Sequence, residues 1–432
     1  MRETDRRSFL QGIGRGIAAA ATGSVSRSSA ASANERVVVA VIGCGGMGSN
    51  HLKLLAARRD VELAYVCDVD RKRAAEAVRR AEGAGAKPKG VHDLRRVLDD
   101  KAVDAVWVAT PDHWHGPAAI LACEAGKHVY VEKPCSHNIR EGRLMVEAAR
   151  KHKRIVQAGM QSRSTDYIRE GIQRLREGVI GEVLVAKAWN SQKRSNIGHA
   201  QPSEPPTEID YDLWVGPAPM VPYQSNRLHY NWHWWYAFGS GDMGNDGVHE
   251  LDIARWGLGI ETPPATVAAL GGKYGFDDDQ QFPDTQYVVF DFPGDGRVGH
   301  KKQLIFEQRI WSPYPEHGAE NGNAFYGTKG MMILAKNGGW TILKGESRKG
   351  SVSVPAHHQN FLDCIRNDAK PNADIEVGHL SATLCHLGNL AARLGRTLQY
   401  DAESEAITSE PNGDRLVRRD YREGHWAVPR GV

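Results

Sequence analysis

Residues 37–68 read VVVAVIGCGGMGSNHLKLLAARRDVELAYVCD, and this stretch decides the fold. A β-branched run leads directly into Gly43, Gly45 and Gly48, which have the spacing G-x-G-x-x-G. The first glycine permits a tight turn off the strand, the second lets backbone approach a pyrophosphate, and the third allows close helix–strand packing. A helix-forming segment and a second apolar strand, which ends at Asp68, follow. Strand, glycines, helix, strand and terminal acid in this register predict a dinucleotide site.

The same stretch indicates which dinucleotide it binds. The free N–H groups at the start of the helix are expected to face the phosphates. Asp68 is placed to bond the ribose hydroxyls and to repel a 2′-phosphate, so NAD is predicted and NADP is less favoured. Arg71 and Lys72 lie close enough to weaken this preference. The predicted cofactor contacts here are Gly43, Cys44, Gly45, Gly46, Met47, Gly48 and Asp68.

Composition bounds the class of protein. The 432 residues are 41% hydrophobic and 25% charged, which is typical of a soluble protein with room for two domains. A net charge of +3 does not argue for a nucleic-acid partner, and no apolar run is long enough to predict a membrane span. The six cysteines show no CxxC or Cys/His metal spacing, so we expect buried free thiols and no metal site.

The N-terminus has the pattern of a targeting signal. Residues 4–10, TDRRSFL, resemble the twin-arginine export motif, and an Ala-rich stretch and an A-x-A site at 31–33 follow. We therefore expect residues 1–33 to be a signal or disordered segment and the protein to be exported or periplasmic. If these residues are only a basic tail, a cytoplasmic location is expected instead.

Strand and helix patterns alternate over residues 36–159, which predicts a doubly wound parallel sheet, a Rossmann domain. Residues 111–115 are interpreted as a turn in this domain. From 160 to 400 most strand-like runs, such as 298–306, are joined by Gly-containing turns. They predict an α+β domain with a largely antiparallel open sheet. Residues 401–432 are interpreted as a surface tail.

A second group of motifs points to a family. Glu132-Lys133-Pro134 ends the fifth predicted strand, Thr110-Pro111 is followed by His115, and Gly247, His249 and Asp252 open a helix. With Gly327-Thr328-Lys329-Gly330 and the two-domain pattern, the chain after residue 35 resembles the Gfo/Idh/MocA oxidoreductases. The resemblance implies that Lys133 and His249 flank the sugar or polyol carbon that gives hydride to nicotinamide. It also implies cofactor contacts from Thr110, Pro111, His115, Glu132 and Lys133.

The residues themselves agree with a catalytic Lys133. It follows a parallel strand at the carboxyl edge, where open α/β sheets bind ligands, and it could take the proton of an alcohol as hydride leaves. Asn245 departs from the family pattern, which has aspartate four residues before the histidine. A helical repeat would place Asn245 and His249 on one face. The role of Asp246 stays open, and so do structural roles for Lys133 and His249.

Substrate contacts are expected from the aromatic stretch 226–235, chiefly Tyr230 and Trp232, because aromatic faces suit sugar C–H surfaces. Asn245 and Asp246 are further candidates, and Arg163 is a candidate hydroxyl- or carboxylate-binding arm. Trp214 is a candidate lid residue.

These observations favour an NAD-dependent oxidoreductase acting on a sugar, polyol or glycoside hydroxyl. One alternative is a redox-neutral enzyme with captive NAD that cleaves glycosides or moves hydride between sugars. Another is a non-catalytic NAD-binding sensor. The resemblance also implies a homo-oligomer, a dimer or tetramer, formed through the outer face of the second sheet.

Overall fold

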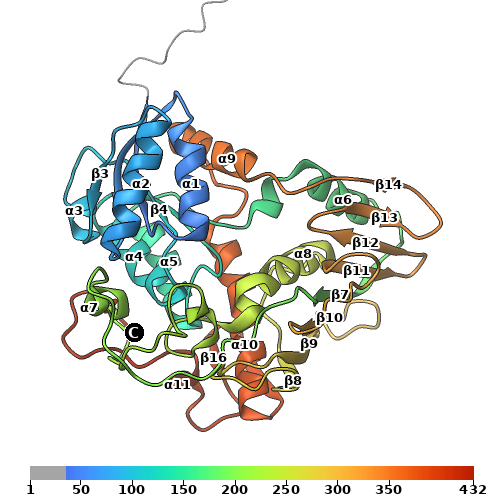
Figure 1. Ribbon diagram of the computed structural model, residues 1–432. Helices are drawn as coiled ribbons and strands as arrows, with labels where there is room; N and C mark the ends of the chain where they lie inside the picture. The colour runs from blue at the N-terminus through green and yellow to red at the C-terminus, as the bar shows by residue number, and fades with distance from the viewer. Residues whose placement is uncertain (1–35) are drawn as a thin grey trace, which may run out of the picture.

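A computed structural model describes residues 36–432 of the chain (Figure 1). The proposed export signal lies outside these residues. The first domain contains a six-stranded parallel sheet in the order β3-β2-β1-β4-β5-β6. Its elements are β1 (Val37–Ile42), α1 (Gly46–Ala56), β2 (Val61–Cys67), α2 (Arg71–Gly83), β3 (Lys89–Val91), α3 (Arg95–Leu98), β4 (Ala105–Val108), α4 (Asp112–Glu124), β5 (His128–Val131), α5 (Ile139–Lys151) and β6 (Val156–Ala158). The predicted Rossmann topology is confirmed.

The second domain is built on a ten-stranded sheet in the order β14-β13-β12-β11-β7-β10-β9-β8-β15-β16. Its pairs are antiparallel except β7 with β10, so the expected largely antiparallel sheet is confirmed. The strands are β7 (Val183–Asn190), β8 (Thr266–Gly272), β9 (Thr285–Phe292), β10 (Lys302–Arg309), β11 (Asn321–Gly327), β12 (Met331–Ala335), β13 (Gly339–Ile342), β14 (Ser347–Arg348), β15 (Leu398–Asp401) and β16 (Ala406–Ile407). The helices are α6 (Asp166–Arg176), α7 (Tyr211–Val215), α8 (Val248–Leu258), α9 (Val354–Asn367), α10 (Ile375–Leu394) and α11 (Gly413–Leu416).

Two local predictions were wrong. Residues 112–115 are the first turn of α4 and not a loop, because Pro111 stands at the N-cap and its missing N–H costs a helix nothing there. The strand expected at 298–306 begins only at Lys302. The preceding residues form a turn in which Gly294, Gly296 and Gly299 have positive φ angles.

Helix α9 belongs to the core of the first domain, although it lies far along the chain. Phe361, Leu362 and Cys364 pack in one hydrophobic cluster with β1, β2 and β4 of the parallel sheet. Figure 1 shows α9 beside α1. The N-terminal domain therefore extends beyond the predicted segment 36–159.

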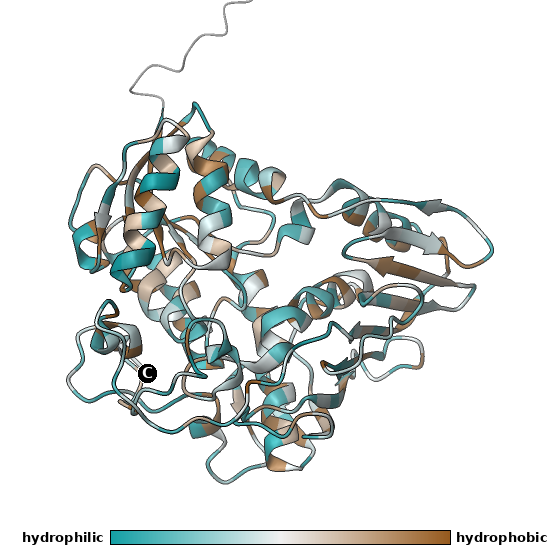
Figure 2. Ribbon diagram, in the orientation of Figure 1, coloured by the Kyte–Doolittle hydropathy of each residue, from teal (hydrophilic) through white to brown (hydrophobic). Residues whose placement is uncertain are grey.

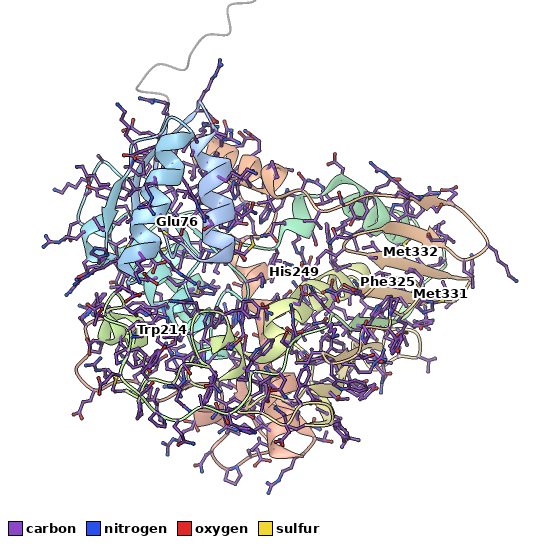
Figure 3. The ribbon with its side chains drawn as sticks, viewed as in Figure 1. Glu76, Trp214, His249, Phe325, Met331 and Met332 are labelled. Atoms are coloured by element: carbon purple, nitrogen blue, oxygen red, sulfur yellow. The ribbon has the colours of Figure 1, made fainter. Side chains whose placement is uncertain are left out.

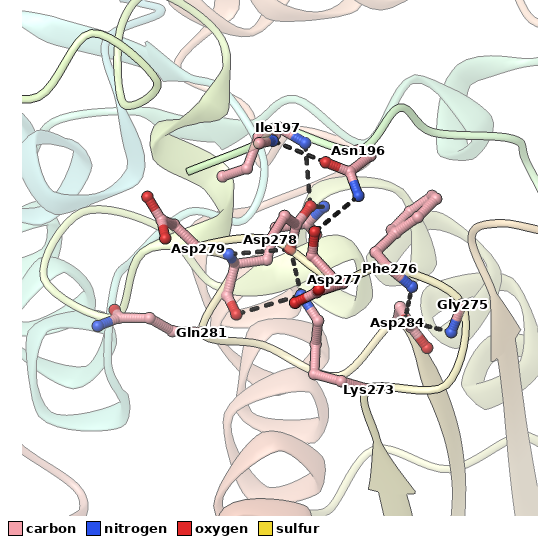
Figure 4. Close-up of polar contacts among 12 residues, drawn as sticks. Asn196, Ile197, Lys273, Gly275, Phe276, Asp277, Asp278, Asp279, Gln281 and Asp284 are labelled. Carbon is pink, nitrogen blue, oxygen red and sulfur yellow. Dashed lines mark hydrogen bonds and ion pairs between the residues drawn. The ribbon is translucent and has the colours of Figure 1, made fainter. Parts of the chain in front are cut away.

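A long segment that follows β7 of the second domain also contacts the first domain. We call this segment, residues 192–222, the strap. Its first part is tied to the second domain by an acidic turn (Figure 4): Ile197 N donates to Asp278 Oδ2 at 2.9 Å, and Asn196 Nδ2 donates to Asp277 O at 3.0 Å. Its middle reaches the first domain, where Arg71 N donates to Glu208 O at 3.0 Å and Asp210 N to Val69 O at 3.0 Å.

The C-terminal residues also bind the first domain. Arg419 Nε donates to Glu141 Oε1 at 2.8 Å, and Tyr421 OH donates to the same oxygen at 2.7 Å. Trp426 packs against Trp114 with ring centroids 5.8 Å apart. The tail thus packs against the first domain, and it also contributes to the wall of the cleft described below.

The distribution of apolar residues explains the layers. Figure 2 shows hydrophilic residues along the outward sides of α1 and α2, while the strands beneath them are buried and apolar. Within residues 36–432 no helix is long and apolar enough to cross a membrane. All six cysteines lie in this range and are buried free thiols, as predicted.

Candidate active site

The glycine loop has the shape that a dinucleotide needs. Gly43 has φ +89°, and a Cβ there would lie 2.5 Å from Ala109 O, while a Cβ on Gly48 would lie 1.8 Å from Gly43 O. Cys44 N donates to Asp68 Oδ2 at 2.7 Å, so the loop is fastened to the acid that ends β2. The N–H groups at the first turn of α1 have no partners within the helix and are available to phosphate. The residues present therefore fit NAD.

A cleft of about 430 Å³ opens from this loop between the two domains. Its walls include most of the predicted cofactor residues and carry Lys133, Tyr230, Trp232 and Asn245. The predicted residues that line it are Gly43, Gly45, Gly46, Met47, Asp68, Thr110, Pro111, His115, Glu132, Lys133, Tyr230, Trp232 and Asn245. The strands of a Rossmann sheet place the adenosine beyond β2 and the nicotinamide at the ends of β4 and β5. Lys133 and Asn245 therefore lie at the nicotinamide end.

Lys133 is held by the segment before α8. Its Nζ donates to Asn245 O and lies 3.4 Å from Asn245 Oδ1. Asn245 Nδ2 in turn donates to Tyr230 OH at 3.2 Å and to Asp242 Oδ1 at 3.0 Å. This places an ammonium, an amide and a phenol side by side in the cleft, a set that can bind and orient a polyhydroxylated molecule.

The segment Met243–Gly247 is a π-helical turn, and it changes the predicted geometry. The sequence predicted that Asn245 and His249 share one helical face, but the wider turn separates them, so that Asn245 lines the cleft and His249 does not. A Cβ on Gly247 would lie 2.5 Å from the Phe306 ring, so this turn packs tightly against β10. π-Helical turns of this kind occur mostly at functional sites.

His249 lies on the first turn of α8, near the centre of the view in Figure 3. Burial, together with the charges of Lys336 and Lys133, lowers its pKa to about 3, so its ring is neutral. Its Nδ1 is buried and neither donates nor accepts a hydrogen bond among the described residues. The catalytic role of His249 stays a prediction, because the ring is close to Lys133 yet outside the cleft wall.

Two residues that the sequence predicted to bind substrate form ion pairs with other side chains of the protein. The Arg163 guanidinium binds Asp252 through Nε at 2.9 Å and Nη2 at 2.9 Å, with both side chains buried. Asp246 is bound by Lys336 at 2.7 Å and by Arg194 at 3.2 Å. Neither residue lines the cleft. Three contacts of the Arg163 guanidinium are made inside the second domain, and its role as a substrate-binding arm stays a prediction.

His115 is also engaged inside the protein. Its Nδ1 lies 2.7 Å from Pro134 O and its Nε2 lies 2.9 Å from Thr110 O. It thereby joins the two loops that follow β4 and β5, and it borders the cleft while it holds the Thr110 and Pro134 backbone in place.

Several residues of the cleft wall were not predicted from the sequence. They come from the strap and from the tail: Ile209, Leu213 and Trp426. His229 and His233, which belong to the predicted aromatic stretch 226–235, also line the cleft. His229 Nε2 lies 3.5 Å from Asp70 Oδ2, beside the ribose end of the cleft. Trp214, in α7 and labelled in Figure 3, borders the cleft and is buried in a hydrophobic cluster, and its role as a lid residue stays a prediction. No local signal marks Trp426, which packs against Trp114 of the first domain.

Glu250, next to His249, allows a pH test of the buried region. Burial raises its pKa to about 8, against an ordinary value of 4.5. The folded protein keeps this proton in a pH range where the unfolded chain has lost it. Stability should therefore fall as pH rises from about 4.5 to about 8.

Glu250→Gln is expected to remove this slope and to raise the free energy of unfolding at pH 8 by a few kcal/mol, on the order of 1–3. Thermal and urea unfolding of both proteins at pH 5 and pH 8 measures it. Glu76→Gln, in an exposed pair with Arg80, is the control and should show no such change (Figure 3). An unchanged slope in the Glu250 variant would contradict the assignment.

Comparisons with known proteins agree with this site. Residues 37–160 match the model of the Gfo/Idh/MocA oxidoreductase family, NAD-binding Rossmann fold. Residues 185–284 and 346–428 match the C-terminal α/β domain model of the same family. The match to an NAD-binding domain confirms the predicted cofactor.

Curated relatives include sugar and polyol enzymes. The chain is 33% identical to inositol 2-dehydrogenase 2 of Saccharopolyspora erythraea over 53% of this chain and 56% of that protein. It is 26% identical to scyllo-inositol 2-dehydrogenase (NAD(+)) of Bacillus subtilis over 78% of this chain and 88% of that protein. It is 35% identical to a glycosyl hydrolase family 109 protein of S. erythraea over 35% and 34%, so it matches about a third of that relative.

Among solved structures, the levoglucosan dehydrogenase complex with NADH has a TM-score of 0.65 at 18% identity, covering 84% of this chain and 99% of that one. At this identity the likeness shows the fold.

Proposed function

Because the chain belongs to the Gfo/Idh/MocA oxidoreductase family, we propose that it moves hydride between the hydroxyl-bearing carbon of a sugar, polyol or glycoside and the nicotinamide of NAD. The observation that carries this proposal is the position of Lys133. It stands after β5 at the nicotinamide end of the cleft, beside Asn245 and Tyr230.

The protein's own residues account for binding and proton transfer. Bound NAD supplies the hydride acceptor. Lys133 Nζ, as the neutral amine, can take the proton of a substrate hydroxyl as hydride leaves, and can return it in the reverse direction. Tyr230 and Trp232 present aromatic faces to the sugar ring, and Asn245 can bond a hydroxyl. The strap and Trp426 form part of the cleft wall and reduce the access of water to the cleft.

The expected cofactor preference follows from Asp68. Its carboxylate stands where the adenosine ribose binds, and it repels a 2′-phosphate. Lys72, which the sequence offered as a compensating cation, is paired with Glu208 of the strap. We expect NAD to bind at least about tenfold more tightly than NADP in a fluorescence titration, a difference of about 1.4 kcal/mol. Comparable affinities would contradict this assignment, and Asp68→Ser should narrow the difference.

A second function is supported by the strap. Its backbone bonds to the β2–α2 turn cover the ribose end of the cleft, so nucleotide exchange should be slow. With the similarity to glycosyl hydrolase family 109 proteins, this supports a redox-neutral cycle in which one NAD oxidises the substrate and is then reoxidised in place.

Two measurements distinguish the simple dehydrogenase from the redox-neutral cycle. Mass spectrometry of the nucleotide released on denaturing the purified protein should find near-stoichiometric NAD or NADH if the cofactor is captive. Incubation with aryl glycosides should then release the aglycone without net NADH. An empty protein that reduces added NAD with a polyol would instead establish the simple dehydrogenase.

We also propose that the outer face of the second sheet is an oligomer interface. Leu270 is 80% exposed and faces its strand neighbour Tyr287, which is 45% exposed, and Tyr326 on β11 is 39% exposed. Exposed apolar residues on a broad sheet favour burial against a second sheet. Light scattering should find a dimer or tetramer, and Leu270→Lys should shift it toward monomer.

A further inference from the structure

A buried chain of hydrogen bonds ends on the glutamate next to Lys133. Trp107 Nε1 donates to His358 Nε2 at 3.3 Å, His358 Nε2 lies 2.8 Å from His51 Nδ1, and His51 Nε2 lies 2.8 Å from Glu132 Oε1. His51, His358 and Trp107 are all at most 1% exposed, and Glu132 is 4% exposed. These residues come from β4, α9, α1 and the end of β5, so the chain crosses the core of the first domain.

The bonding pattern assigns the protons. An indole N–H can only donate, so His358 Nε2 is the acceptor of this bond. A carboxylate can only accept, so His51 Nε2 is the donor to Glu132. His51 therefore fixes a buried carboxylate through a direct hydrogen bond.

The Glu132 carboxylate is fixed in place as well as charged. Its Oε2 accepts from Lys133 N at 3.2 Å, and its Oε1 accepts from Gln161 Nε2 at 3.2 Å. A Cβ on Gly159 would lie 2.8 Å from Oε1, so the group fills its pocket. Burial alone would raise the pKa of Glu132, but the His51 hydrogen bond and charge, with Lys133, hold it at about 2.

Glu132 borders the nicotinamide end of the cleft together with Lys133. The nicotinamide ring is positively charged in NAD⁺ and neutral in NADH. An ammonium beside the ring disfavours the oxidised form, and a carboxylate favours it, because charges at such short range interact strongly in a cleft shielded from water. The ionised Glu132 therefore offsets Lys133.

We propose that His51 is a positioning residue that keeps the Glu132 carboxylate charged and fixed, so that the site prefers oxidised nicotinamide over reduced nicotinamide. The proposal rests on NAD as the cofactor of the proposed function, but not on its substrate or on hydride transfer. Loss of this preference and loss of catalysis are therefore separate results.

The test is the ratio of the dissociation constants of NADH and NAD⁺, measured by titration of nucleotide-free protein at pH 6. His51→Leu removes the donor to Glu132, and it should lower the ratio about tenfold, chiefly by weakening NAD⁺. His51→Gln keeps an amide donor and should restore most of the preference. Cys364→Ala, a change in the same hydrophobic cluster without contact to Glu132, should leave the ratio unchanged.

The pH dependence gives a second readout. The titratable groups that face Glu132 are His51 on α1, Tyr130 on β5, Lys133, His115 on α4, His249 on α8, and His357 and His358 on α9. Burial lowers the pKa values of four of these histidines, which therefore stay neutral above pH 6.5: His115, His249, His357 and His358. The native ratio should thus be flat above pH 6.5, whereas in His51→Leu it should rise with pH as Glu132 loses its proton.

Equal weakening of both nucleotides in His51→Leu would overturn the proposal, because a loss of packing acts on both forms alike. Unchanged affinities for both would overturn it as well.

Discussion

Lys133→Met should lower kcat for oxidation of a sugar or polyol about 10³-fold, because it removes the group that accepts the hydroxyl proton. NAD⁺ affinity should not fall, since the phosphates and the ribose are held by the glycine loop and Asp68 and the variant removes a positive charge beside the nicotinamide. Steady-state kinetics with a panel of inositols and anhydrosugars, together with an NAD titration, measure both quantities.

His249→Asn is the matched comparison for this experiment. If His249 only packs behind Lys133, this variant should lose about tenfold or less, a loss typical of an indirect effect. A loss equal to that of Lys133→Met would place His249 in the proton path, as the family resemblance implies. No turnover by the native protein on this panel, with nucleotide binding intact, would support the non-catalytic sensor, and full activity of Lys133→Met would exclude Lys133 as the proton acceptor.

Arg163→Met should destabilise the fold by about 3 kcal/mol, because it leaves the buried Asp252 carboxylate without its bidentate partner. Arg255, 3.6 Å from the same carboxylate, keeps the loss near the lower end of the range for a broken buried pair. Urea unfolding followed by tryptophan fluorescence measures it.

The same variant tests whether Arg163 stabilises the fold or, as the sequence predicted, binds the substrate. The folded fraction of Arg163→Met should keep its KM for substrate. Arg163→Lys, which keeps the charge, should recover part of the stability. A large rise in KM with unchanged stability would restore Arg163 as a substrate-binding arm.

The first domain was predictable because its signals are local. The close approach of Gly48 to Gly43 and the bond from Cys44 N to Asp68, just after β2, join residues fewer than thirty positions apart, so the sequence reports them directly. The position of Lys133 follows from the same regularity, since the carboxyl ends of parallel strands meet at one edge.

The parts that were missed depend on contacts between distant segments. Arg163 meets Asp252 after 89 residues, and Trp426 reaches a cleft whose other walls lie in the first 250 residues. A pattern of residue types cannot tell whether a basic side chain will face ligand or carboxylate. The π-helical turn at Met243–Gly247 is likewise selected by tertiary packing, here against Phe306.

The return of α9 to the parallel sheet affects how the chain folds during synthesis. His51 and its partner His358 are 307 residues apart, and the cluster under β1 stays open until Phe361 has been made. Domains usually fold as they emerge, N-terminal part first. Here the first domain cannot close its core until most of the chain has left the ribosome. Its exposed sheet must be protected during that interval, so we expect the nascent chain to depend on chaperones more than its regular topology suggests.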